Sequence, residues 1–117
     1  MSKGGPKTGV PGGWGPWTAF DQVETDRARA LLVLFRGEAE KTLNNGKAFE
    51  AFIPLSYQTQ VVAGTNYSIL AFVGDLGGSG QPKLPGPTVH FEVFWGLGPA
   101  LPELTKVEWW VYEQAKK

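Results

Sequence analysis

The sequence contains no cysteine and only one histidine, His90. Without cysteine the chain can form neither a disulfide nor a thiolate metal site, and it has no thiol nucleophile. A lack of cysteine also fits a reducing compartment. His90 stands between Val89 and Phe91 in a strand-like segment. We therefore expect either a structural histidine with satisfied hydrogen bonds or a solvent-facing one.

Sequence motifs of enzymes are missing as well. A Ser-His-Asp set would have to draw on Ser2, Ser56, Ser68 or Ser79, and none of these lies in a nucleophile-elbow sequence. The sequence shows no phosphate-binding loop and no cluster of metal ligands. An active site made of Asp and Glu alone stays open, although no pair stands out. We expect a protein that is not an enzyme and that uses no cofactor and no metal.

An excess of one charge and long apolar runs are also absent. Eleven acidic and eleven basic residues give a net charge of zero, and no basic block suits a phosphate backbone. The longest apolar run, residues 30–35, is far too short to cross a bilayer, and the first residues lack the apolar core of a signal peptide. These features predict a cytoplasmic protein that binds neither nucleic acid nor a membrane.

The 117 residues suffice for one domain with a single core. Residues 1–17 are rich in glycine and proline and predict a flexible N-terminal arm, and residues 18–117 predict the single domain. Trp14 and Trp17 lie in that arm. Either they fold back onto the core or they contact a partner, and the sequence leaves both alternatives open.

A helix is predicted from about residue 21 to residue 43, because apolar residues recur there every three or four positions. Gly37 costs about 1 kcal/mol relative to alanine, so the last turns could bend or fray. Asn44, Asn45 and Gly46 provide a stop and a turn. The expected apolar stripe consists of Val23, Ala30, Leu31, Leu34, Phe35, Ala39 and Leu43.

After Gly46 the apolar period drops toward two, which predicts strands over residues 49–62, 66–73, 88–95 and 106–112. Pro54 indicates a bulge or an edge position. The long segment of residues 75–87 is more typical of a tolerated insertion than of a binding element. The predicted fold class is α+β, with one long helix packed across a four- to five-stranded antiparallel sheet.

The turn between the first two predicted strands carries Gln60, Val62 and Gly64 in the pattern Q-x-V-x-G, followed by Thr65-Asn66-Tyr67. This stretch resembles the central motif of the cystatins, which inhibit papain-like cysteine proteases, and it is closest to the cysteine-free intracellular stefins. Pro11-Gly12-Gly13 resembles the N-terminal trunk of the stefins. Val93-Phe94 with Leu97 resembles their second hairpin, although Gly98 replaces the usual proline, which here comes one place later.

The resemblance implies a cystatin-like fold and a reversible, tight-binding inhibitor that occludes the active-site cleft of papain or a cathepsin-type protease. Such inhibitors present a wedge made of the N-terminal trunk and two hairpin loops. Glycine in the trunk would allow close backbone approach, and the glycine that closes the first loop would need a positive φ. On this sequence the protease-binding residues would be Gly12, Gly13, Trp14, Gln60, Val61, Val62, Ala63, Gly64, Trp95, Leu97, Gly98 and Pro99.

The main alternative is a non-inhibitory module on the same fold that binds a peptide, a carbohydrate or another protein. The inhibitor requires Trp14, Trp95 and the first hairpin at one end of the molecule, whereas a different binding module does not. One residue of the adjacent pair Phe94 and Trp95 must face the core, and the sequence does not say which. We expect a monomer, with a domain-swapped dimer if the hairpin that contains Val61 and Val62 opens.

Overall fold

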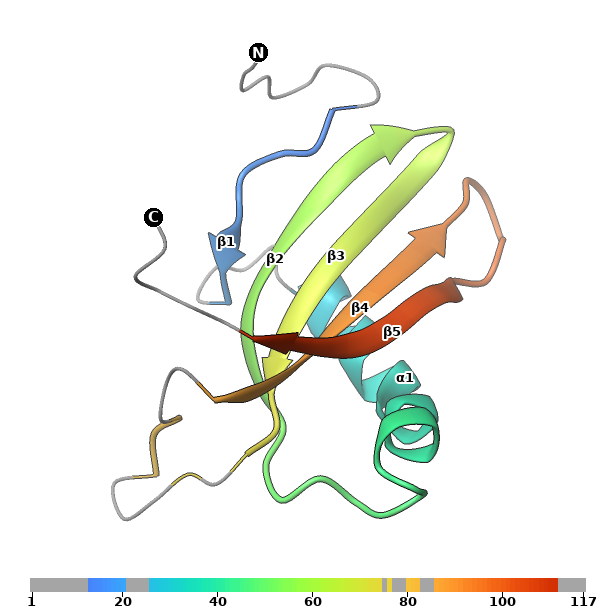
Figure 1. The fold of residues 1–117 in the computed structure, drawn as a ribbon. Helices are drawn as coiled ribbons and strands as arrows, with labels where there is room; N and C mark the ends of the chain where they lie inside the picture. Colours follow the sequence, from blue (N-terminus) through green and yellow to red (C-terminus); the bar gives the residue numbers. More distant parts are fainter. Residues whose placement is uncertain (1–12, 21–25, 75, 77–79, 83–85, 112–117) are drawn as a thin grey trace.

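The computed structural model describes residues 13–20, 26–74, 76, 80–82 and 86–111. Its elements are β1 (Thr18–Ala19), α1 (Asp26–Leu43), β2 (Ile53–Val62), β3 (Gly64–Phe72), β4 (Pro87–Trp95) and β5 (Glu103–Val111). The strands form one antiparallel sheet in the order β1-β2-β3-β4-β5, and α1 lies across one of its faces (Figure 1). The predicted α+β fold is confirmed, and it is consistent with the cystatin-like arrangement. No helix in the described ranges is long and apolar enough to cross a membrane.

The four predicted strands correspond to β2, β3, β4 and β5. The predicted irregularity at Pro54 is confirmed, because the register of β2 against β3 shifts between Pro54 and Ser56. The short edge strand β1 was not predicted individually, since its two residues are too few to show an alternating pattern. It pairs with β2 through Thr18 opposite Tyr57.

Helix α1 begins at Asp26 and continues without a break through Gly37 to Leu43. The predicted helical residues 21–25 lie outside the described residues. The predicted stop is confirmed: Asn45 and Gly46 have φ values of 55° and 81°, and the Gly46 amide donates to the Glu40 carbonyl oxygen at 3.0 Å. A left-handed pair of residues closed by such a bond is a common helix end.

The predicted apolar stripe of α1 is partly wrong. Ala30 and Leu34 are exposed, and Ala28 and Leu32 are buried in their place. The reason is that residues 30–35 are all apolar, so they cover the whole circumference of the helix and spacing alone does not show which side meets the sheet. Val23 lies outside the described residues.

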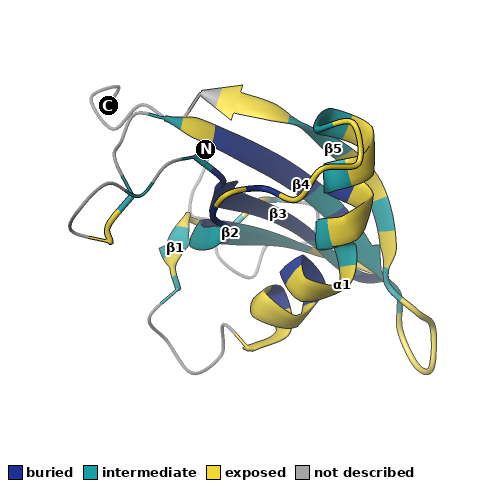
Figure 2. Cartoon of the chain, turned by 90° about the horizontal axis from the view of Figure 1, so that it is seen from below, coloured by how far each residue is buried: buried dark blue, intermediate teal, exposed yellow. Residues whose placement is uncertain are grey.

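The core fills the space between α1 and the facing side of the sheet (Figure 2). Alternate residues of the two central strands point into it, as the two-residue period of a strand requires. The central members of the core are Leu31, Leu32, Tyr67, Ile69, Ala71, Val89, Phe91 and Val93.

A polar clamp joins α1 to the chain that follows it. The Arg36 side chain donates from Nε to Glu40 Oε2 at 2.8 Å, and the Phe49 amide donates to the same oxygen at 3.0 Å. Arg36 also donates to the Phe49 carbonyl oxygen at 3.3 Å. The hydrogen bonds from Arg36 and from the Phe49 backbone lower the pKa of Glu40 below its ordinary value.

Replacing Glu40 by glutamine is expected to lower the free energy of unfolding by about 1 to 2 kcal/mol at neutral pH, because hydrogen bonds to a charged group are lost. Since the folded-state pKa is lowered from 4.5, the contribution of Glu40 is complete above that value and is lost as the pH falls through the lowered pKa. Urea unfolding at pH 7 and at a series of lower pH values measures both effects. The control Glu38→Gln changes an exposed glutamate of α1. Equal losses in the two variants, or a loss that does not shrink as the pH falls, would contradict this account.

Candidate binding surface at one end of the sheet

The hairpin between β2 and β3 is tight and apolar. Val61 pairs with Thr65 and Val62 with Gly64, which leaves Ala63 alone at the tip. The side chains of Val61, Val62 and Ala63 are exposed. The two valines are therefore strand residues that continue to the very end of the hairpin, and their extended backbone presents apolar side chains to solvent. The hairpin therefore ends in an extended apolar tip.

Gln60 helps to hold the hairpin rather than pointing freely outward. Asn66 Nδ2 donates to Gln60 Oε1 at 2.8 Å across the hairpin. The two residues are directly opposed in the β2–β3 register. The Gln60 side chain thus stabilises the hairpin from within, as cross-strand pairs do.

Gly64 connects the first hairpin to the second. Its φ of 121° lies in a region that L side chains rarely adopt, which confirms the predicted positive φ. A Cβ atom at this position would lie 2.7 Å from the Trp95 carbonyl oxygen and 2.9 Å from the Gly96 Cα. Only glycine allows the backbones of the two hairpins to approach this closely.

The described part of the N-terminal arm lies along β2. Trp14 forms an antiparallel bridge with Gln60, and the Gly15 amide donates to the Thr59 carbonyl oxygen at 2.8 Å. Gln58 Nε2 donates to the Gly15 carbonyl oxygen at 2.9 Å. These bonds place the half-buried Gly13 and the exposed Trp14 beside the first hairpin. The predicted site residue Gly12 lies outside the described residues.

Neither tryptophan of the arm belongs to the core, because the rings of Trp14 and Trp17 remain exposed. The core arrangement that the sequence left open for them is therefore not found. Trp14 lies close to the first hairpin, because its backbone bridges to Gln60.

In the second hairpin, between β4 and β5, Trp95 is turned toward the domain. It packs against the core, the Arg27 guanidinium lies 4.9 Å from its ring centroid, and its Nε1 donates to the Ala100 carbonyl oxygen at 3.1 Å. Since neighbours on a strand point to opposite faces, Phe94 points to the other face of the sheet. The predicted site residue Trp95 thus anchors the second hairpin and does not offer its whole ring to a partner.

The exposed apolar residues of this hairpin are Leu97 and Leu101, whose side chains are 71% and 85% exposed. Leu97, Gly98 and Pro99 were predicted as site residues, whereas Leu101 was missed. The sequence did indicate that Leu101 would be exposed. It lies in the Gly- and Pro-rich stretch of residues 96–102, where no strand or helix provides a face that could bury a leucine. Gly98 has a φ of 69° and forms the turn.

The three segments meet at one end of the sheet, although they are far apart in the sequence (Figure 1). Thr65 at the first hairpin pairs with Trp95, just as Gln60 bridges to Trp14. We name the exposed residues of this end the wedge surface. It consists of Trp14, Val61, Val62, Ala63, Leu97, Gly98, Pro99 and Leu101.

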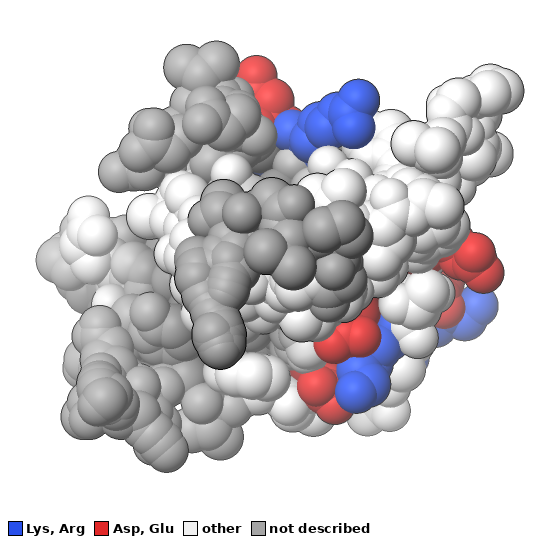
Figure 3. Space-filling view, turned by 90° about the horizontal axis from the view of Figure 1, so that it is seen from above, with Lys and Arg blue, Asp and Glu red and all other residues white. Residues whose placement is uncertain are grey.

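The wedge surface carries no charge. Residues 51–74 and 93–102 contain no Asp, Glu, Lys or Arg. Viewed from this end, uncharged surface extends toward the upper right of the molecule, and charged side chains lie at its margins (Figure 3). Burying such a surface against a partner strips no ion of water, so the apolar contact is not offset by a large desolvation cost.

His90 belongs to a hydrogen-bonded network on the sheet face opposite α1. Its Nε2 lies 2.6 Å from Ser68 Oγ, and its Nδ1 lies 2.8 Å from Glu108 Oε2. The bond from His90 lowers the pKa of Glu108. Although the order serine, histidine, carboxylate is that of a hydrolase triad, Ser68 is only 3% exposed and sits in the middle of a strand. Of the two alternatives that the sequence left open for His90, its burial and its two hydrogen-bonded neighbours fit the structural one and not the solvent-facing one.

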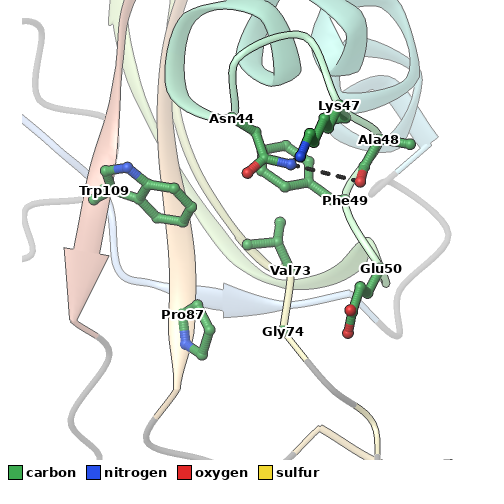
Figure 4. Close-up of a pocket in the computed structure, with 9 residues that line it drawn as sticks. All are labelled: Asn44, Lys47, Ala48, Phe49, Glu50, Val73, Gly74, Pro87 and Trp109. Atoms are coloured by element: carbon green, nitrogen blue, oxygen red, sulfur yellow. Dashed lines mark hydrogen bonds between the residues drawn. The ribbon is translucent and has the colours of Figure 1, made fainter.

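A pocket of about 460 Å³ lies at the other end of the sheet, where β3 ends and β4 begins (Figure 4). The Trp109 ring packs edge to face against Phe49 at 6.2 Å between centroids, so Trp109 points to the same side as α1. The pocket shares no residue with the wedge surface. Its lining consists of Asn44, Lys47, Ala48, Phe49, Glu50, Val73, Gly74, Pro87 and Trp109.

Over the described ranges, no three His, Asp or Glu side chains are grouped to hold a metal ion. Neither a protein-family model nor a curated protein matches the chain. The functional argument therefore depends on the wedge surface and on the motif within it.

Proposed function

We propose that this chain is a reversible, tight-binding inhibitor of papain-like cysteine proteases and that it acts in the cytoplasm. The observation that carries the proposal is the convergence of Trp14, the QVVAG hairpin and the second hairpin at one uncharged end. The resemblance to the cystatins requires that convergence, because the inhibitor must place three segments in one cleft. A module that used its five tryptophans for another partner would not require it.

The proposed mechanism is occlusion of the protease active site without chemistry. Val61 and Val62 enter the cleft as an extended, rigid hairpin, which loses little conformational freedom on binding. Their apolar area gains roughly 25 cal/mol for each Å² that is buried. The wedge covers the catalytic cysteine and histidine of the protease with a hairpin tip, and no peptide bond of the inhibitor is presented in a scissile geometry. The chain therefore leaves the complex uncleaved.

The second hairpin contributes in a way that differs from the sequence-based expectation. The Trp95 ring is held by Arg27 and by the Ala100 carbonyl oxygen, so it sets the position of the loop. Leu97 and Leu101 supply the exposed apolar contact. Gly98, which stands where stefins usually have proline, provides the left-handed turn that separates them.

Binding to papain with a carboxymethylated catalytic cysteine tests this mechanism, because such papain cannot form a covalent adduct or cleave the chain. Isothermal titration calorimetry is expected to give one chain per protease. A negative heat-capacity change is also expected, because apolar surface is buried. No binding at about 10 μM protein would overturn the proposal and favour a non-inhibitory module for a peptide, a carbohydrate or another protein.

A domain-swapped dimer of this chain is expected to be inactive. If the hairpin opens at Ala63, β2 and β3 join into one long strand and the tip of the wedge no longer exists. Gel filtration after partial unfolding separates such a dimer from the monomer, and papain inhibition is then measured on both fractions. A swapped dimer that inhibits as well as the monomer would remove the first hairpin from the mechanism.

A further inference from the structure

The outward side of α1 carries an apolar strip that no other described residue of the chain covers. Ala30, Val33, Leu34 and Gly37 are exposed, and their spacing of three and four places them on one side of the helix. Val33 and Leu34 are 75% and 58% exposed. The buried residues of α1 lie on the opposite side, toward the sheet, and Figure 2 shows the change from dark blue to yellow around the helix. We name these four residues the outer helix strip.

Nothing in the described part of the chain requires a glycine at position 37. A Cβ atom at this position would meet nothing within 4 Å, and its backbone is ordinary helix. Glycine inside a helix costs about 1 kcal/mol relative to alanine. What glycine does provide is room for another backbone to come close. Ala30 lies about two helical turns before Gly37 on the same strip, and its small side chain provides room in the same way.

The strip is complementary to itself when a second copy lies antiparallel to it. A twofold axis between Val33 and Leu34 places Ala30 of each copy opposite Gly37 of the other. Small residues therefore face each other on both sides of the axis, and the side chains of Val33 and Leu34 pack at the centre. The same axis places Asp26 of one helix beside Lys41 of the other. A parallel pair would instead place each of these charges beside its own equivalent.

The two terminal charges are available for this pairing. Asp26 and Lys41 are exposed, and neither joins an ion pair within the described part of the chain. They lie about 22 Å apart along the helix axis, so each end of the strip carries one charge. The apolar centre and the opposite charges at its two ends together identify a second copy of this chain as the partner.

We propose that two copies of this chain associate through antiparallel α1 helices, with the outer helix strip at the interface. The strip is small compared with the roughly 800 Å² per partner of a standard interface, so the dimer is weak and exchanges rapidly. None of the wedge residues takes part. Each copy therefore keeps its wedge surface, and the dimer does not depend on the proposed inhibition.

Sedimentation equilibrium of the full chain over about 5 to 500 μM tests the proposal, with an expected dissociation constant on the order of 100 μM. Val33→Asp is expected to make the chain monomeric throughout this range. Circular dichroism confirms that each variant is folded. A wild-type chain that stays monomeric at the highest concentration would overturn the proposal. So would a dimer that survives dilution and the Val33→Asp substitution, since that is the behaviour of strand exchange.

A charge exchange separates the antiparallel pair from other arrangements. Asp26→Lys is expected to weaken association by about threefold to tenfold, because each copy contributes one Asp26–Lys41 contact. The double variant Asp26→Lys/Lys41→Asp is expected to restore it. Both variants place an unfavourable charge at the N-terminus of α1, so a helix-end effect alone would not be rescued. Failure of the double variant to recover association would exclude the antiparallel arrangement.

Discussion

The Val62→Asp variant is expected to inhibit papain about 100-fold more weakly than the unmodified chain, which corresponds to about 2.7 kcal/mol of binding free energy. Val62 is an exposed residue of the first hairpin and is adjacent to the Ala63 tip. On binding, its side chain would be buried in an apolar cleft, and an aspartate there must lose its water without gaining a partner. Because Val62 is exposed in the free chain, the substitution should barely change stability.

Val33→Asp is the matched control for this prediction. It introduces the same charge at an exposed valine, but in α1, outside the wedge surface. It is expected to leave inhibition unchanged at the nanomolar concentrations of the assay, where the helix-mediated dimer is dissociated. Inhibition constants from substrate hydrolysis compare the two variants directly. A similar loss in both, or no loss in Val62→Asp, would contradict the placement of the first hairpin in the cleft.

Gly64→Ala is expected to lower the free energy of unfolding by about 3 kcal/mol or more, the largest stability effect that we predict for a single substitution. Two costs add. An L residue is strained at a φ of 121°, and the new Cβ would lie 2.7 Å from the Trp95 carbonyl oxygen. The Trp95 carbonyl oxygen and the Gly96 Cα, which would lie 2.9 Å away, are backbone atoms, so a side-chain rotation cannot relieve these contacts. The hairpins must separate, and inhibition should weaken as well.

Gly98→Ala measures the first of these costs alone, the strain of an L residue at a positive φ. Gly98 has a φ of 69°, but a Cβ there would meet nothing within 4 Å. The expected loss is about 1 to 2 kcal/mol, the usual cost of a left-handed conformation for an L residue. Urea unfolding of both variants gives the comparison. If Gly64→Ala cost no more than Gly98→Ala, close contact between the two hairpins would not be the reason for glycine at position 64.

The sequence predicts the strands well because alternation with a period of two survives in each of them, even where Pro54 interrupts the register. It predicts the existence of α1 but not its orientation. Residues 30–35 are apolar all around the helix, so the side that meets the sheet is decided by packing. Three members of the outer helix strip, Ala30, Val33 and Leu34, are the part of this run that the sheet leaves uncovered.

The candidate site was predictable where a local motif carries it, as in the first hairpin. The direction of Trp95 was not, because neighbouring residues on a strand are equivalent until the buried face is known. The meeting of Ser68, His90 and Glu108 depends on the register of three strands, which no local pattern records. Leu101 lies outside the motif residues, so the motif did not include it, although its place in the Gly- and Pro-rich stretch of residues 96–102 was a usable signal of exposure.

A titration of papain with the purified chain tests the central claim most directly, with hydrolysis of a small fluorogenic substrate as the readout. The account predicts reversible inhibition that saturates at one chain per active protease molecule, with the chain recovered uncleaved. Full protease activity in the presence of about 10 μM chain would contradict the account, as would cleavage of the chain within residues 60–64.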